Sequence, residues 1–143
     1  MAVHEGWGVV PHLNILDGRA AEAIDVYART FGATEKGRHP ADDGKRLLHV
    51  ALDVNGGLLM MHDDFPEMRG GQPSPPPSGV VLHLQVDDAD AVWARALENG
   101  FTVRFPLDDQ FWGDRYGQVV DPFGHIWSIG ATIPGGAGGV AAG

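Results

Sequence analysis

Apolar and polar residues alternate in two stretches of the chain that are identical at five of nine positions. VVPHLNILD begins at residue 9, and VVLHLQVDD begins at residue 80. An alternation with a period of two is typical of a β-strand that has one buried face. The opposite face carries a histidine and then an amide, His12 and Asn14 in the first stretch, His83 and Gln85 in the second. The repetition predicts two strands with the same place in two related halves.

An amphipathic pattern follows each of these two strands. Residues 18–33 and residues 89–101 carry apolar side chains at spacings of three and four. This spacing predicts one helix in each half, with one face buried. Gly32 and Gly100 stand where a left-handed residue would end each helix. Asp87 or Asp88 can cap the second helix by accepting its free backbone N–H groups.

A hairpin is predicted after the first helix. Asn55-Gly56, a strong signal for a two-residue turn, separates the apolar stretches 45–54 and 58–64. A two-residue loop pairs Val54 with Gly57, and therefore Ala51 with Met60. This register predicts two faces. The helix side carries Leu48, Val50, Leu52, Val54, Leu59 and Met61, and the opposite side carries His49, Ala51, Asp53, Leu58, Met60 and His62.

A second hairpin is predicted near the end of the chain. Strand-like residues 116–121 and 125–132 flank a turn that contains Asp-Pro-Phe-Gly. If Val120 pairs with His125, then Arg115, Val119 and Ser128 lie together on the face turned away from the helix.

These elements predict an α+β fold made of two βαβββ modules. The modules occupy residues 8–65 and 80–132, and together they are expected to form a curved mixed sheet with the helices on its convex side. The stretch 66–79 is rich in proline and glycine, which favours an extended linker. Residues 133–143 show no periodic pattern and are expected to be disordered.

Composition narrows the classes of partner. The chain has 143 residues, a formal net charge of −9 and no cysteine. An acidic chain without a basic stripe argues against nucleic acid and anionic membranes as partners. The absence of cysteine excludes disulfides and thiolate chemistry. We see no secretion signal and no apolar run long enough to span a bilayer, so a cytoplasmic protein is expected.

The repeated unit, with a histidine on each leading strand, resembles the vicinal oxygen chelate superfamily. That superfamily includes glyoxalase I, extradiol dioxygenases, and the fosfomycin and bleomycin resistance proteins. The stretch FWGDRYGQVVDPFGHIWSI, residues 111–129, is similar to the signature of its PhnB-like subgroup. PHLNILDGRAAEAIDVYARTFGA, residues 11–33, resembles the first strand and helix of that subgroup. The resemblance spans residues 9–132 and implies the fold above, within a homodimer.

The resemblance also implies where a metal would bind. Members that catalyse reactions hold one divalent metal through a histidine or glutamine on each leading strand and a carboxylate on each last strand. By position, His12 and His83 match the leading-strand ligands. Met60 and Ser128 stand where the carboxylates would be, and neither side chain carries a negative charge.

A three-histidine site is one way to replace the missing carboxylates. His62, or the neighbouring Asp63, lies further along the strand of Met60. His12, His62 and His83 would then form a site with an open position for a divalent metal such as Zn, Ni, Mn or Fe.

A small-molecule ligand is expected on the concave face. The candidate ligand-binding residues are Met60, Phe111, Trp112, Arg115, Val119 and Ser128. Arg115 can hold a carboxylate or phosphate with its planar guanidinium, or it can instead contact Asp114 within the chain.

Three functions fit these residues. The first is a PhnB-like protein that binds a small molecule in the cleft without the family's usual metal. The second is a divalent-metal lyase or isomerase that uses His12, His83 and His62. The third, a dioxygenase, ranks last because it needs a carboxylate beside two histidines. Whether the protein is an enzyme stays open.

Overall fold

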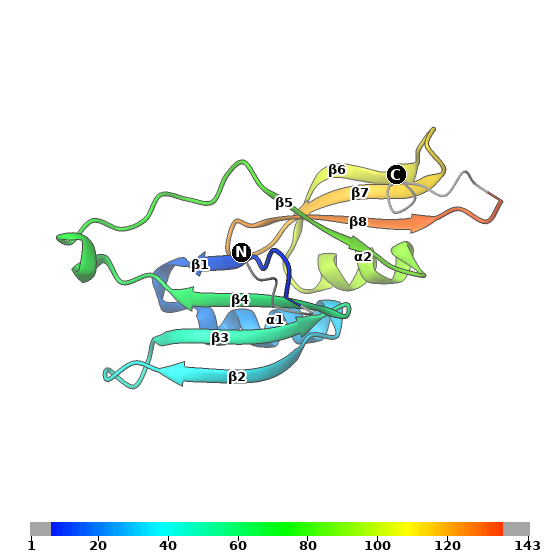
Figure 1. Ribbon diagram of the computed structural model, residues 1–143. Helices are drawn as coiled ribbons and strands as arrows, with labels where there is room; N and C mark the ends of the chain where they lie inside the picture. The colour runs from blue at the N-terminus through cyan, green and yellow to red at the C-terminus, as the bar shows by residue number, and fades with distance from the viewer. Residues whose placement is uncertain (1–6, 136–143) are drawn as a thin grey trace. The chain divides into compact units, whose positions relative to one another are not determined.

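The computed structural model describes residues 7–135, and the chain divides into two compact units between residues 76 and 77 (Figure 1). Most of the predicted disordered tail, residues 136–143, lies outside the described residues. No helix within the described residues is long and apolar enough to cross a membrane. The predicted limits of the modules and the linker stay predictions.

The first unit is a four-stranded mixed sheet with one helix. Its elements are β1 (His12–Ile15), the 3-10 turn η1 (Leu16–Gly18), α1 (Ala20–Phe31), β2 (Thr34–Pro40), β3 (Leu47–Val54), β4 (Gly57–Asp63) and the 3-10 turn η2 (Pro66–Arg69). The strand order is β1-β4-β3-β2, and only β1 and β4 run parallel.

The second unit repeats this arrangement. Its elements are β5 (Val81–Gln85), α2 (Ala89–Glu98), β6 (Thr102–Asp109), β7 (Asp114–Val120) and β8 (Ile126–Thr132). The strand order is β5-β8-β7-β6, with β5 parallel to β8. The α+β fold of two βαβββ modules is therefore confirmed, with one mixed sheet in each module.

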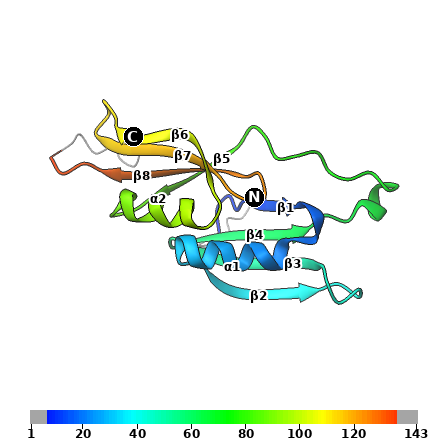
Figure 2. The same cartoon turned by 180° about the vertical axis from the view of Figure 1, so that it is seen from behind.

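The core of the first unit lies between its sheet and α1, which runs along β3 and β4 (Figure 2). The sheet contributes fully buried side chains that include Ile15, Val50, Leu52 and Met61. Gly32 ends the helix with a φ of 69°, a left-handed conformation that costs glycine little. The helix and its predicted stop are thus confirmed.

The first hairpin has the predicted register. Asn55 and Gly56 have φ of 51° and 80°, as a tight primed turn requires. Val54 pairs with Gly57, and Ala51 pairs with Met60. One prediction for this face is wrong: Leu48 is exposed and Leu47 is buried.

A bulge explains the exchange of the two leucines. The pairing between β2 and β3 shifts between His39, which faces His49, and Pro40, which faces Leu47. The extra residue, Leu48, has no partner in this register and turns outward.

The second hairpin differs from the prediction by one residue. Val120 pairs with Ile126, not with His125. Asp121 closes the turn instead, because its N–H donates to the carbonyl of His125 at 2.8 Å. Its side chain accepts from the N–H groups of Phe123 and His125 and from the indole of Trp127. A one-residue shift moves every side chain of a strand to the other face.

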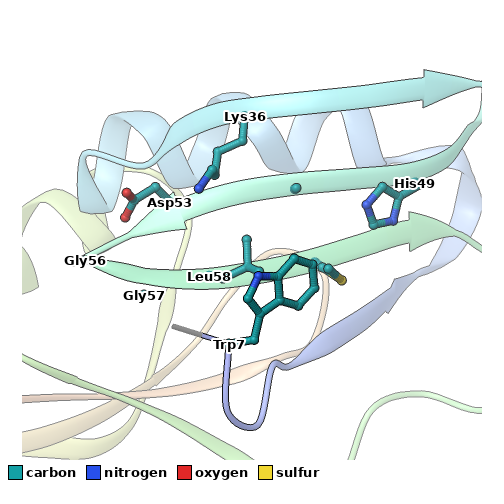
Figure 3. A pocket seen from close by; sticks show the side chains of 9 residues that line it. Trp7, Lys36, His49, Asp53, Gly56, Gly57 and Leu58 are labelled. Atoms are coloured by element: carbon teal, nitrogen blue, oxygen red, sulfur yellow. The ribbon is translucent and has the colours of Figure 1, made fainter. Parts of the chain in front are cut away.

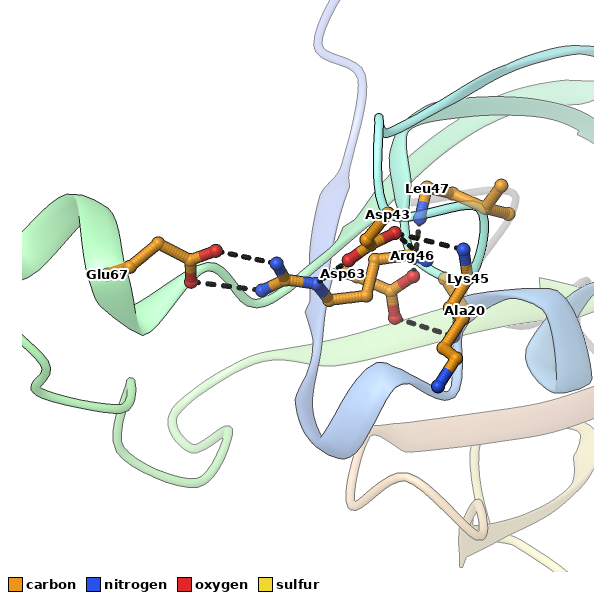
Figure 4. A network of polar contacts seen from close by, with 7 residues as sticks. All are labelled: Ala20, Asp43, Lys45, Arg46, Leu47, Asp63 and Glu67. Carbon is orange, nitrogen blue, oxygen red and sulfur yellow. Dashed lines mark hydrogen bonds and ion pairs between the residues drawn. The ribbon is translucent and has the colours of Figure 1, made fainter.

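A buried carboxylate joins three elements of the first unit. Asp63, at the end of β4, accepts from the N–H of Ala20 at 2.8 Å and from the N–H of Leu47 at 2.7 Å (Figure 4). These two N–H groups begin α1 and β3. The Asp63 side chain is fully buried, so both hydrogen bonds are shielded from water.

An arginine near this carboxylate fastens the segment after β4. Arg46 donates to both carboxylate oxygens of Glu67, at 2.9 and 2.6 Å, and also pairs with Asp43 (Figure 4). Its guanidinium lies 4.3 Å from the centre of the Phe65 ring. Such surface pairs are weakened by water and salt, so they position this segment more than they stabilise the fold.

Replacing the buried carboxylate should destabilise the first unit. We expect Asp63→Ala to lower the free energy of unfolding by about 3 kcal/mol, because two buried N–H groups lose a charged acceptor. Asp53→Ala makes the same change on the polar side of β3 and should cost less than about 1 kcal/mol. Urea unfolding followed by circular dichroism measures both. Equal losses of stability from the two substitutions would contradict the stabilising role assigned to the buried carboxylate of Asp63.

Candidate functional site

The face of the first sheet that is turned away from α1 carries one histidine from each strand. His12 comes from β1, His62 from β4, His49 from β3 and His39 from β2. The ring of His12 lies 4.8 Å from that of His62 and 5.9 Å from that of His49, measured between centroids. The rings of His39 and His49 are 6.1 Å apart. We refer to these four residues as the histidine row.

The backbone sets the tautomer of His62. Its Nδ1 lies 2.8 Å from the carbonyl oxygen of Asp63. A carbonyl oxygen can only accept, so Nδ1 carries the proton in this bond. The other nitrogen, Nε2, then keeps a lone pair that can accept a proton or bind an electrophile.

The neighbours of His12 oppose its protonation. Partial removal of water by the surrounding protein, with smaller contributions from His62 and His49, lowers the pKa of His12 below its usual value. The ring of His12 is therefore neutral over a wider pH range than a free imidazole.

Beside the histidine row lies a hollow of about 270 Å³ (Figure 3). Its lining residues are Trp7, Lys36, His49, Ala51, Asp53, Gly56, Gly57, Leu58 and Met60. The indole of Trp7 lies over β4, while Lys36 of β2 and Asp53 of β3 line the opposite part of the hollow (Figure 3). Met60, a predicted ligand-binding residue, thus lines a hollow with apolar and charged side chains.

The second sheet holds His83 by both ring nitrogens. Its Nδ1 lies 2.7 Å from the Ser128 hydroxyl, and its Nε2 lies 2.8 Å from the amide oxygen of Gln85. Gly130 on β8 leaves room for this ring, because a Cβ there would stand 3.0 Å from His83 and from Gln85.

Aromatic side chains surround His83. Tyr116 stacks beside it, with ring centres 5.9 Å apart, and Trp112 contacts Tyr116 edge to face at 5.5 Å. Phe111 packs against Trp112 but is 95% exposed. Among the predicted ligand-binding residues, Trp112 thus joins the aromatic group around His83, and Ser128 lies buried beside the ring.

The predicted placement of Arg115 and Val119 with Ser128 is wrong. In the observed register Gln118 pairs with Ser128, so Arg115 and Val119 lie on the helix side of β7. Val119 is fully buried there. Arg115 forms ion pairs at 3.1 Å with Asp90 of α2 and with Asp109, not with Asp114.

Two comparisons identify the family. The model of the glyoxalase/bleomycin resistance protein/dioxygenase superfamily matches residues 9–129. An uncharacterised protein of Mycobacterium bovis is 49% identical over 137 residues, which are 93% of this chain and 88% of that protein. The chain belongs to the glyoxalase/bleomycin resistance protein/dioxygenase superfamily.

Solved structures of other proteins have a similar fold. Protein PA1353 from Pseudomonas aeruginosa aligns with a TM-score of 0.72 and 27% identity, over 87% of this chain and 97% of that one. A putative 3-demethylubiquinone-9 3-methyltransferase, the PhnB protein from Bacillus cereus, aligns with a TM-score of 0.68 and 17% identity over 87% and 99%. At that identity the likeness shows the fold alone.

The side chains present do not fit the divalent metal that the superfamily implies. Asp63 points into the core and is held by two backbone N–H groups. Asp114, a carboxylate of the second sheet, is fully buried and accepts from Trp112 and Gln85. Within residues 7–135, no three histidine, aspartate or glutamate side chains converge as metal ligands. Neutral imidazoles, a thioether and a hydroxyl give a hard cation no charged ligand.

Several residues of the site were not predicted from the sequence. Trp7 and Lys36 line the hollow, and Tyr116 stacks on His83. His49, in contrast, was predicted on this face, because it lies two residues before Ala51 and Ala51 pairs with Met60. Lys36 sits at a bulge in β2, between Glu35 and Gly37, and no sequence pattern marks that bulge.

The lowered pKa of His12 predicts that the stability of the folded chain falls as the pH is lowered. Above the usual histidine pKa both folded and unfolded chains are neutral at this residue. As the pH falls, the unfolded chain takes up the proton first, so His12 reduces stability under mildly acidic conditions. NMR titration should place the pKa of His12 below that of a free histidine, and His62→Gln should raise it.

His39→Gln serves as the control, because His39 does not act on the charge of His12. If His62→Gln and His39→Gln moved the pKa equally, the influence assigned to His62 would be wrong.

Proposed function

We propose that this superfamily member binds a small molecule in the hollow on the polar face of the first sheet, without a metal. The observation that carries the proposal is the lining of the hollow. Trp7, Leu58 and Met60 supply apolar surface, and Lys36 and Asp53 supply one charge of each sign. Mostly apolar walls with a few placed polar groups are typical of sites for small molecules.

The hollow also limits the size of the ligand. Its volume of about 270 Å³ lies just below the range for ligand sites, roughly 300–1,000 Å³. It therefore suits a small ligand, or one apolar part of a larger one. Trp7 is 47% exposed, so one wall of the hollow still has surface to bury on binding.

Placing a charge in the hollow should weaken binding. A thermal-shift screen of small aromatic and aliphatic compounds selects probes, and titration calorimetry measures their affinity. We expect Met60→Lys to weaken these probes by about tenfold or more, because an ammonium would occupy apolar space. The matched control is Met68→Lys, which makes the same change at an exposed residue of η2 outside the hollow. Equal losses from both variants would place the ligand elsewhere.

Metal content tests the second part of the proposal. Protein purified without a histidine tag should hold far less than one Zn, Ni, Mn or Fe per chain, and added salts of these metals should leave its melting temperature unchanged. The reason is that no three histidine or carboxylate side chains converge as ligands within residues 7–135. Stoichiometric metal that is lost in both His12→Ala and His83→Ala would instead support the metal-dependent lyase or isomerase.

A further inference from the structure

A chain of hydrogen bonds in the second unit leads from a buried carboxylate to His83. Asp114 accepts from the indole N–H of Trp112 at 3.2 Å and from the amide nitrogen of Gln85 at 3.4 Å. A carboxylate offers only acceptors, so the NH₂ end of the Gln85 amide faces Asp114. The amide oxygen therefore faces His83.

The orientation of Gln85 determines which nitrogen of His83 carries the proton. The amide oxygen lies 2.8 Å from Nε2 and can only accept, so Nε2 is the protonated nitrogen. Nδ1 then holds the lone pair of the neutral ring and accepts from the Ser128 hydroxyl at 2.7 Å. Both ring nitrogens are occupied, although the His83 residue itself is exposed.

The histidines that the structure describes in the first unit form fewer hydrogen bonds than His83 does. His62 donates Nδ1–H to a carbonyl and keeps its Nε2 lone pair. No hydrogen bond to the His62 Nε2 or to either nitrogen of His12 occurs among residues 7–135. Imidazoles with an available lone pair therefore lie on the first sheet. On the second sheet both ring nitrogens of the equivalent leading-strand histidine, His83, form hydrogen bonds.

We propose that the two modules have divided the roles of their histidines. Asp114, acting through Gln85, positions His83 as a hydrogen-bonded aromatic residue that is neither a metal ligand nor a base. His12 and His62 are the histidines available for chemistry or for contact with a ligand. This proposal goes beyond ligand binding in the hollow and stands without it, because it concerns hydrogen bonds within each unit.

Carbethoxylation by diethyl pyrocarbonate tests the proposal, because the reagent reacts at an imidazole lone pair. Peptide mass spectrometry gives the rate at each histidine of the intact chain. His83 should react more slowly than His62, although His62 is the more buried residue. Without the Gln85 oxygen the ring proton can move to Nδ1 and be donated to the Ser128 hydroxyl, which leaves the lone pair on Nε2. Gln85→Leu should therefore raise the His83 rate by about tenfold, the change expected from losing one hydrogen bond.

Two controls make the result decisive. Gln118→Leu removes an amide from the same face of β7, where Gln118 bonds to Tyr116 and not to His83, and should leave the His83 rate unchanged. His125 is buried in the second unit, so its slow reaction reports that the Gln85→Leu chain is folded. The proposal fails if wild-type His83 reacts as fast as His62, or if Gln85→Leu in a folded chain does not accelerate it.

Discussion

The first unit depends on the carboxylate of Asp63. Its side chain satisfies the N–H groups that begin α1 and β3, so the helix and the central hairpin are fixed to the end of β4. Its backbone carbonyl accepts a hydrogen bond from Nδ1–H of His62. One residue therefore connects the buried side of the sheet with its polar side. Because the carboxylate of Asp63 is held inside by these two N–H groups, it is not available to the imidazoles on the polar side.

The same separation of carboxylates from imidazoles governs the second unit. Asp114 is fully buried and reaches His83 only through Gln85. Both modules thus keep a histidine on the leading strand and hold the nearby carboxylate away from it. Repeated strands preserve the fold of the superfamily, while the hydrogen bonds of each module decide what its histidine can do. This is why family membership does not by itself assign a metal to the chain.

Most of the fold was predictable from the sequence, because local patterns specify it. Helical spacing and Gly32 located α1, and Asn55-Gly56 determined one register, since a two-residue loop leaves little choice. The second register was not predictable in this way. There the turn is closed by Asp121, whose side chain binds the backbone of its own loop, and proline, glycine and apolar spacing do not report that hydrogen bond.

The site was less predictable for a related reason. The sequence placed His12, His62 and Met60 on one face, but the hollow also needs Trp7 and Lys36, which reach it from a loop and a bulge. The homodimer and the cytoplasmic location stay predictions.

The outer strand β6 has a further consequence for how this chain can associate. Its pairing with β7 is irregular on both sides of Phe105, and Pro106 within the strand has no N–H to donate. A strand from another molecule would need an unbroken series of donors and acceptors along that edge. The irregular pairing of β6 therefore makes this edge a poor template for strand addition, even though Val103 and Phe105 are exposed there.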